Sequence, residues 1–331
     1  MEETIVKKFN IKDKIFSHLE TWRLYTVIWC GLVSLAGSCI AYGHFPPLHI
    51  AFLAFIIPMM GWIAGLYLSD FLDKKLDKIE KPHRPIPSGR MHPYEALFIG
   101  TVFAGTGLVL SFYLGIYNLS LVFIVAFLVL GYAKFSKSRG ILGNINRGLI
   151  TTAAFFYGIF STGQSIDTIP IYIWILSLVF LVHDTNSNLI GAIRDMEGDK
   201  KADYMTIPVK YGLKNSIFIS LFLTFIWYFI LIVNTFYYNF LKIEFYYLLS
   251  IDILIIFSMY VYLFQSIKNY SRKRALKFHE FFVIERIILA SALIFGKAQN
   301  SIAFIILISA LIFTFLSQMF LRKRYEFGAT K

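Results

Sequence analysis

Three aspartates stand close together in the sequence, directly after a long apolar run. Asp70, Asp73 and Asp77 are spaced i, i+3 and i+7, so a continuous helix places them within about 60° of one another on one face. Three carboxylates on one face repel one another, and the repulsion is costly at the edge of a membrane. A bound divalent cation removes it. The stretch 69–77 therefore predicts a metal site.

A second acidic stretch lies near the middle of the chain. Asp195, Asp199 and Asp203 follow one another at intervals of four residues, which is about one helical turn. Asp184 and Asn188 fall on the same stripe, because the eleven residues from Asp184 to Asp195 make about three turns. The predicted helix thus carries a polar face from its buried part to its end.

Basic residues follow each acidic stretch, and together the two kinds of charge limit the ligand. A solvated, charged helix end explains either acidic stretch alone, but two such stretches followed by cations favour a shared site. Carboxylates alone repel a phosphate, whereas carboxylates with cations suit a diphosphate bridged by Mg²⁺. The candidate diphosphate-binding cations are Lys81, Arg84, Lys137, Arg139, Arg194, Lys200 and Lys201.

The elements that position these residues are predicted to be membrane helices. The chain has 331 residues, of which 57% are hydrophobic and 16% charged, a composition too apolar for ordinary soluble domains. We expect an all-α integral membrane protein, a bundle of nine or ten transmembrane helices around a central cavity. The predicted spans are 22–42, 47–69, 94–115, 117–133, 142–162, 169–190, 214–236, 244–265, 279–298 and 301–321.

The formal net charge of +12 is explained by topology. With ten spans and a cytoplasmic N-terminus, nearly all lysines and arginines fall in cytoplasmic segments, as the positive-inside rule expects. Both termini and both aspartate clusters are then predicted on the cytoplasmic side, and no nucleic-acid partner is required. We expect a cytoplasmic or interfacial segment at 1–21, one transmembrane domain at 22–321, and a basic cytoplasmic tail at 322–331. An apolar interior beside a diphosphate site favours a lipid diphosphate as ligand.

These stretches resemble the UbiA-type family of intramembrane prenyltransferases. Residues 69–89 match its Asn-Asp-x-x-Asp-x-x-x-Asp pattern and the Lys-Pro-x-Arg-Pro-Ile-Pro-Ser-Gly loop after it, except that Ser69 replaces the family's Asn. Residues 194–199, with Thr206-Ile-Pro-Val209, are similar to the second family pattern. A weaker match joins Tyr132, Lys137 and Gly143-Asn144. Asp203 departs from the pattern, since Gly is common there, and ten spans exceed the usual nine.

The resemblance implies two Mg²⁺-binding clusters and a diphosphate site. Its first cluster is Asp70, Asp73 and Asp77, and its second is Asp195 and Asp199. The diphosphate partners it implies are Lys81, Arg84, Lys137 and Arg194. Further polar residues either line an acceptor pocket or orient the aspartates: Ser69, Tyr132, Asn144, His183, Asp184, Asn186 and Asn188. Glu280, Glu285 and Arg286 form a buried ion pair or join the cavity.

The expected reaction transfers a prenyl group from its diphosphate to an aromatic or lipid-like acceptor through an allylic cation. Placed cations and Mg²⁺ stabilise the charge that develops on the diphosphate, and aromatic faces stabilise the cation. The aromatic candidates are Tyr67, Tyr132, Phe155, Phe156 and Tyr157. Two alternatives remain open at this point: a cyclase that uses no external acceptor, and a non-catalytic lipid carrier or transporter.

Overall fold

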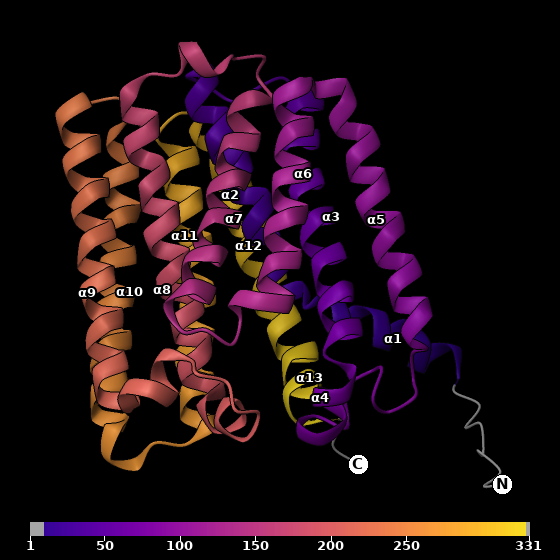
Figure 1. Ribbon diagram of the computed structural model, residues 1–331. Helices are drawn as coiled ribbons and strands as arrows, with labels where there is room; N and C mark the ends of the chain where they lie inside the picture. The colour runs from indigo at the N-terminus through magenta and orange to yellow at the C-terminus, as the bar shows by residue number, and fades with distance from the viewer. Residues whose placement is uncertain (1–9, 329–331) are drawn as a thin grey trace, which may run out of the picture.

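The computed structural model describes residues 10–328, and this part of the chain contains helices and no strand (Figure 1). Its helices are α1 (Ile11–Trp22), α2 (Leu24–Tyr42), α3 (Leu48–Leu72), α4 (Lys74–Glu80), α5 (Pro93–Leu114), α6 (Ile116–Gly131), α7 (Ile141–Phe160), α8 (Ile171–Lys201), α9 (Ile207–Tyr238), α10 (Ile243–Ser266), α11 (Arg272–Phe295), α12 (Asn300–Ser317) and α13 (Lys323–Phe327). Short turns of other helix types are η1 (Tyr132–Ser136), η2 (Ile166–Thr168), η3 (Ile267–Asn269) and η4 (Gln318–Arg322).

The long helices run side by side in one bundle (Figure 1). α8 packs against α7 and α9, α3 packs against α2 and α5, and α11 packs against α2, α8, α10 and α12. Within a bilayer every backbone N–H and C=O needs an internal partner, which helices provide. The all-α prediction is therefore confirmed.

Eight helices among the described residues are long and apolar enough to cross a membrane. They are α2, α3, α5, α6 with η1, α8, α9, α10, and α12 with its continuation to Phe327. The other two predicted spans coincide with α7 and α11, which are helices of the bundle but carry more polar residues. The chain is thus an integral membrane protein, and the number of nine or ten spans remains a prediction.

The first acidic stretch is not one continuous helix. α3 ends at Leu72, Asp73 caps its C-terminus, and α4 begins at Lys74. The α-helix is interrupted between Asp70 and Asp77, so the three aspartates do not lie on the one continuous helix that their spacing predicts. This part of the sequence interpretation is wrong. Asp195 and Asp199 of the second stretch lie on one unbroken helix, α8, which continues through Gly198, but Asp203 lies beyond its end at Lys201, so the predicted helical position of Asp203 is wrong.

Close packing of α2 on α7 fixes the centre of the bundle. A Cβ atom on Gly158 would lie 1.7 Å from the carbonyl oxygen of Ser34, and one on Gly37 would lie 2.3 Å from that of Phe155. Glycine at these two positions therefore lets the backbones of the two helices approach, as small residues do in membrane bundles. Because α7 packs in turn against α8, which carries the polar stripe, this contact also positions the site.

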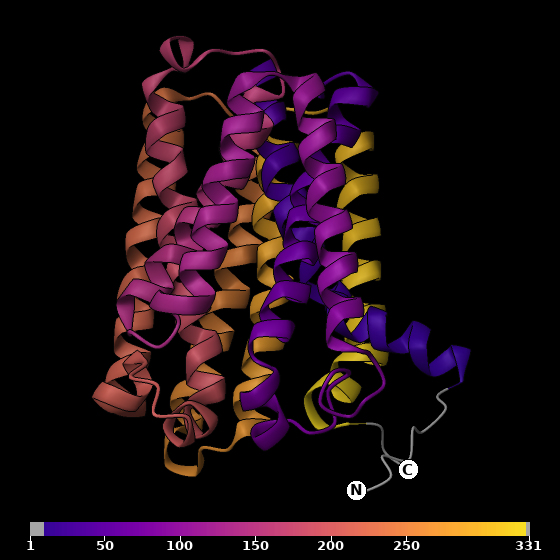
Figure 2. The same cartoon turned by 45° about the vertical axis from the view of Figure 1, so that its right-hand side comes forward.

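The short helices gather at one end of the bundle. α1 runs across that end, and α4 and α13 lie beside it (Figures 1 and 2). The segment 322–328, part of the predicted basic tail, is folded there, with Arg322, Tyr325 and Glu326 all buried. Residues 1–9 and 329–331, which include other parts of the predicted terminal segments, lie outside the described residues.

Candidate active site

A cavity of about 510 Å³ opens between α2, α3, α5, α6, α7 and α8. Most of its wall is apolar and includes Leu97, Ala104, Leu121, Val125 and Ala153. Charged side chains gather at one part of the wall, which we call the polar end. The polar end consists of Asp73, Asp77, Lys81, Arg84, Lys137, Arg194, Asp195 and Asp199. The structure therefore brings together residues from both acidic stretches and from the loops between them.

Asp73 joins two distant parts of the chain at the polar end. Its carboxylate accepts a hydrogen bond from the Lys137 ammonium at 2.6 Å and one from the Ser69 hydroxyl at 3.3 Å. Burial lowers the pKa of Lys137, but the neighbouring Asp73 carboxylate outweighs it, and the net shift is upward. Lys137 thus stays protonated, and Ser69 still makes a polar contact in place of the family's Asn.

Asp77 is neutralised by the basic loop that follows α4. The Arg84 guanidinium donates to both carboxylate oxygens, at 2.8 and 2.9 Å, and both side chains are buried. Lys81 lines the cavity close by, and burial lowers its pKa below the ordinary lysine value. Since a cation loses hydration on burial, Lys81 has the most to gain from an anionic ligand.

Asp70 differs from its two neighbours. It is buried and pairs with Arg23 at 2.8 Å, and it does not line the cavity. Arg23 lies at the junction of α1 and α2, so this pair fastens α3 to the N-terminal helices. Asp70 therefore lies outside the cavity wall and supports the site through its contact with Arg23.

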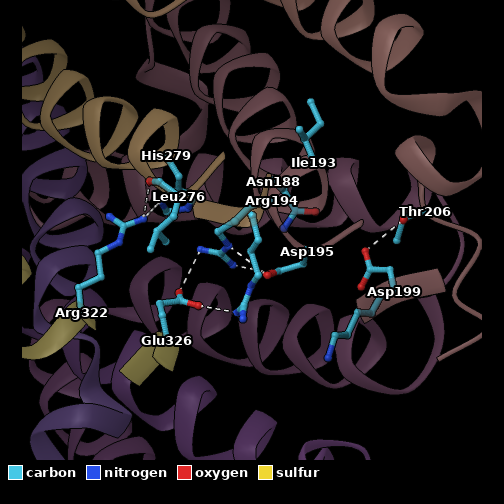
Figure 3. A network of polar contacts seen from close by, with 12 residues as sticks. Asn188, Ile193, Arg194, Asp195, Asp199, Thr206, Leu276, His279, Arg322 and Glu326 are labelled. Atoms are coloured by element: carbon cyan, nitrogen blue, oxygen red, sulfur yellow. Dashed lines mark hydrogen bonds and ion pairs between the residues drawn. The ribbon is translucent and has the colours of Figure 1, made fainter. Parts of the chain in front are cut away.

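The α8 carboxylates both face the cavity (Figure 3). Asp195 accepts two hydrogen bonds from its neighbour Arg194, at 2.5 and 3.1 Å. Asp199 accepts one from the Thr206 hydroxyl at 3.1 Å, and no cation pairs with it among residues 10–328. Arg194 also lies 3.5 Å from Glu326, a residue of α13 (Figure 3).

The α13 segment supplies residues that sequence reasoning missed. The Tyr325 ring lies under two guanidinium groups, 4.6 Å from that of Arg23 and 4.5 Å from that of Arg84. Its carbonyl oxygen accepts a hydrogen bond from His83 at 2.9 Å. Glu326 pairs with Arg272 at 2.9 Å. Tyr325 and Glu326 both line the cavity, so a segment far along the chain helps to hold the cations of the polar end.

A network of buried polar groups continues deeper along α8. Asp184 lines the cavity, accepts a hydrogen bond from Thr151 at 2.7 Å and pairs with Arg286 at 3.1 Å. His183 and Glu285 lie 2.9 Å apart on the other side of α8 and do not line the cavity. Arg286 lines the cavity together with Asp184, whereas Glu285 belongs to the helix packing.

Asn144 and Arg139 also lie outside the cavity wall. Asn144 contacts the Asn188 amide at 3.1 Å, and Asn188 in turn donates to the Tyr132 hydroxyl at 3.4 Å, so Asn144 supports residues that do face the cavity. Arg139 stacks on Phe135 at 3.5 Å and borders a separate shallow depression. The structure does not bring Arg139 to the polar end.

Of the predicted aromatic residues, some line the cavity and others do not. Tyr132 and Tyr157 line the cavity. The Tyr67 hydroxyl is held instead by His18 and Trp22 at 2.7 and 2.8 Å. Phe155 and Phe156 belong to the packed interior between α7 and its neighbours rather than to the cavity wall.

Sequence reasoning also missed Arg147, which lines the cavity from α7. Of the missed residues, only Arg147 had a signal in the sequence, since it is a charged residue within a predicted span. Nothing in the sequence singles out Arg23, Tyr325 or Glu326, because their roles depend on which helices meet at the polar end.

The donor set of the polar end fits Mg²⁺ that arrives with a phosphate ligand. In the part of the chain that is described, no three acidic, His or Cys side chains form a complete metal site. The four carboxylates of the polar end nevertheless face the same cavity: Asp73, Asp77, Asp195 and Asp199. Mg²⁺ commonly takes one or two carboxylates and completes its shell with phosphate oxygens and water. The arrangement therefore suits a metal shared between protein and substrate.

The comparison with known proteins identifies the class. The chain matches the model of the UbiA prenyltransferase family over residues 28–285, and it belongs to that family. The predicted resemblance is confirmed, and the chain is a prenyltransferase. It is 31% identical over 198 residues to the digeranylgeranylglyceryl phosphate synthase of Pyrococcus horikoshii, a match that covers 60% of this chain and 70% of that protein.

Solved structures of the family share the fold. A structure described as digeranylgeranylglyceryl phosphate synthase aligns with a TM-score of 0.64 and 26% identity, covering 86% of this chain and 98% of the other. A UbiA homologue from Aeropyrum pernix K1 aligns with a TM-score of 0.68 and 17% identity, and the alignment covers 87% of this chain and 98% of the other. A UbiA homologue from Archaeoglobus fulgidus, bound to DMAPP and Mg²⁺, aligns with a TM-score of 0.54 and 16% identity, and the alignment covers 91% of this chain and 100% of the other.

Proposed function

We propose that this protein catalyses Mg²⁺-dependent transfer of a prenyl group from a prenyl diphosphate to a lipid acceptor. The observation that carries the proposal is the polar end of the cavity, where four carboxylates and four cations from distant segments surround one end of an apolar space. The family homologue from Archaeoglobus fulgidus, whose structure holds DMAPP and Mg²⁺, supports both the diphosphate and the metal.

The acidic and basic residues of the polar end have different roles. Asp73, Asp77, Asp195 and Asp199 hold Mg²⁺, which when bound neutralises part of the diphosphate charge and so stabilises it as a leaving group. The cations that pair with three of these carboxylates line the same cavity. Lys137, Arg84 and Arg194 then donate to phosphate oxygens, together with Lys81, and fixed positive charge stands where negative charge develops.

The apolar part of the cavity holds the prenyl chain and excludes water. The C1–O bond of the prenyl group breaks, and its electron pair leaves with the diphosphate. The acceptor hydroxyl oxygen bonds to C1, and its proton passes to the departing diphosphate. Tyr132 and Tyr157 face this space, so their rings are placed to stabilise the allylic cation.

The acceptor is proposed from the relatives' names. Proteins named digeranylgeranylglyceryl phosphate synthase match this chain in both sequence and structure. We therefore take geranylgeranyl diphosphate as the donor and geranylgeranylglyceryl phosphate as the acceptor. This lipid-like acceptor takes preference over an aromatic one, and over the cyclase reaction that needs no acceptor.

The test uses purified protein in lipid vesicles with Mg²⁺, geranylgeranyl diphosphate and a panel of acceptors, with products read by mass. An adduct with the glyceryl phosphate lipid is the expected result. An adduct with an aromatic acceptor alone would replace the proposed acceptor. A cyclised hydrocarbon without added acceptor would favour the cyclase alternative, and no consumption of donor would contradict the proposal.

The proposal extends to topology. α7 and α11 run alongside the eight apolar helices, so we count ten spans within a single transmembrane domain at 22–321, with the polar end on the cytoplasmic side. Lys78 in α4 and Lys242 before α10 are then on opposite sides. Labelling of K78C and K242C with an impermeant thiol reagent in inside-out vesicles should modify only K78C. The reverse pattern would overturn the orientation.

A further inference from the structure

Arg147 is a cation of the cavity wall without a carboxylate partner. It extends from α7 into the cavity, and its guanidinium lies 4.2 Å from the centre of the Trp62 ring and 5.7 Å from that of Tyr132. No salt bridge joins it to any acidic residue within 10–328. At the polar end, Arg84, Lys137 and Arg194 each have a carboxylate at 2.8 Å or less.

An unpaired guanidinium in this position is costly. Arginine stays charged at every accessible pH, and an ionisable group within a membrane span usually faces a polar cavity and serves a ligand. The carboxylate that shares its part of the wall is Asp184, which already pairs with Arg286 and Thr151. Asp184 and Arg286 thus pair with each other, whereas Arg147 has no carboxylate within salt-bridge distance in the described part of the chain.

Stacking on the aromatic rings leaves the N–H groups of the Arg147 guanidinium free to bind a ligand. Rings of Trp62 and Tyr132 contact Arg147 by cation–π interaction, and the N–H groups of a stacked guanidinium remain free to bind a planar or tetrahedral oxyanion through two bonds. The Tyr132 hydroxyl is itself tied to Asn188 on α8. Arg147 thus lies beside the polar end without belonging to it.

We infer that Arg147 binds the phosphate of the acceptor lipid and so determines acceptor specificity. The inference rests on the proposed function. The polar end already supplies Lys81, Arg84, Lys137 and Arg194 for the donor diphosphate. An acceptor hydroxyl must reach C1 of the prenyl group next to that diphosphate, so the acceptor head group lies in the neighbouring part of the cavity. Among the described arginines that line the cavity outside the polar end, Arg23 and Arg286 pair with Asp70 and Asp184, which leaves Arg147 to bind the head group.

The experiment compares two acceptors that differ only in the phosphate: geranylgeranylglyceryl phosphate and geranylgeranylglycerol. The variants are Arg147→Met, which keeps length and removes charge, and Arg147→Lys, which keeps charge and removes the planar fork. Arg274→Met is the matched control, since Arg274 is exposed at the start of α11. The measured quantities are the KM of each acceptor, the KM of geranylgeranyl diphosphate, and the melting temperature.

We expect Arg147→Met to raise the KM of the phosphorylated acceptor by about 10- to 100-fold, the size of a lost hydrogen bond to a charged group. The KM of geranylgeranylglycerol and of the donor should stay within about twofold of wild type, and Arg147→Lys should be intermediate. A retained preference for the phosphorylated acceptor in Arg147→Met would overturn the inference.

A raised KM for the donor would also overturn it, because Arg147 would then serve the diphosphate. A wild-type protein that consumes no geranylgeranyl diphosphate with either acceptor would contradict the proposed function itself. A lowered melting temperature that Arg147→Lys restores, with unchanged acceptor preference in both variants, would assign Arg147 to packing.

Discussion

The two acidic clusters look alike in sequence but are neutralised differently. Asp70, Asp73 and Asp77 each have a cation from outside α3 and α4. These pairs are Asp70–Arg23, Asp73–Lys137 and Asp77–Arg84. On α8, by contrast, Asp195 pairs with its own neighbour Arg194, and Asp199 has only the Thr206 hydroxyl. The first cluster therefore ties segments together, whereas the second presents its charge along one helix.

This difference separates structural from chemical roles. A carboxylate with a buried cationic partner stabilises the fold only while the pair is intact, because removal of one member leaves an uncompensated charge. A carboxylate without a cation has both oxygens available to a metal ion. Within the proposed function, Asp199 is a metal ligand foremost, the cavity-facing Asp73 and Asp77 serve both roles, and Asp70 serves the fold. Each of the following predictions tests one part of this division.

The largest effect is expected at Asp199. Asp199→Asn removes a charge that faces the cavity and leaves no cation unpaired, so kcat/KM for prenyl transfer should fall by about 10³, with the melting temperature unchanged. Asp203→Asn is the matched control, because Asp203 is exposed beyond the end of α8 and does not line the cavity. Its activity should stay within about threefold of wild type. Equal losses in both variants would contradict a special role for Asp199.

At Asp77 we expect a substitution to lower both stability and activity. Asp77→Ala leaves the buried Arg84 guanidinium without its partner, which should cost about 3–5 kcal/mol of stability as well as activity. The double variant Asp77→Ala with Arg84→Met removes both charges and should recover much of the lost stability but none of the activity. Thermal unfolding in detergent and the transfer assay measure the two effects separately. Stability that is unchanged in the single variant would show that the pair does not tie the loop to α4.

A smaller effect is expected at the α13 segment. Tyr325→Leu removes the ring that contacts Arg23 and Arg84, and the KM of the prenyl diphosphate should rise by about tenfold, the size of one or two cation–π contacts. Tyr325→Phe keeps the ring and should behave like wild type. Activity that is equal in the Leu and Phe variants would assign α13 to packing alone.

The smallest effect is a pH dependence at Lys81. Burial lowers the pKa of Lys81, so its ammonium loses its proton at a lower pH than that of an exposed lysine. The KM of the prenyl diphosphate should therefore rise as pH increases through the alkaline range, while it stays constant on the acidic side of that pKa. Lys81→Arg should move this rise to higher pH, since arginine remains charged. A pH profile that is identical in the two proteins would exclude Lys81 as its source.

Sequence alone predicted the features that depend on local spacing. The stripe from Asp184 to Asp199 follows from helical periodicity and appears on α8 as expected. The break at Asp73 was not predictable, since no Gly or Pro marks it and its carboxylate is bound by Lys137, 64 residues further along. Glu326 belongs to a stretch that resembles an ordinary basic terminus, and its place beside Arg194 depends on how α13 packs against α1.

The central claim is that the carboxylates of the polar end support Mg²⁺-dependent cleavage of a prenyl diphosphate. The most direct measurement is single-turnover release of diphosphate from geranylgeranyl diphosphate, in the presence of the glyceryl phosphate acceptor, by the wild type and by the Asp73→Ala/Asp199→Ala variant. We predict release in the wild type that requires Mg²⁺ and stops on chelation, and none in the variant. Equal release by both proteins, or release that survives chelation, would contradict the account.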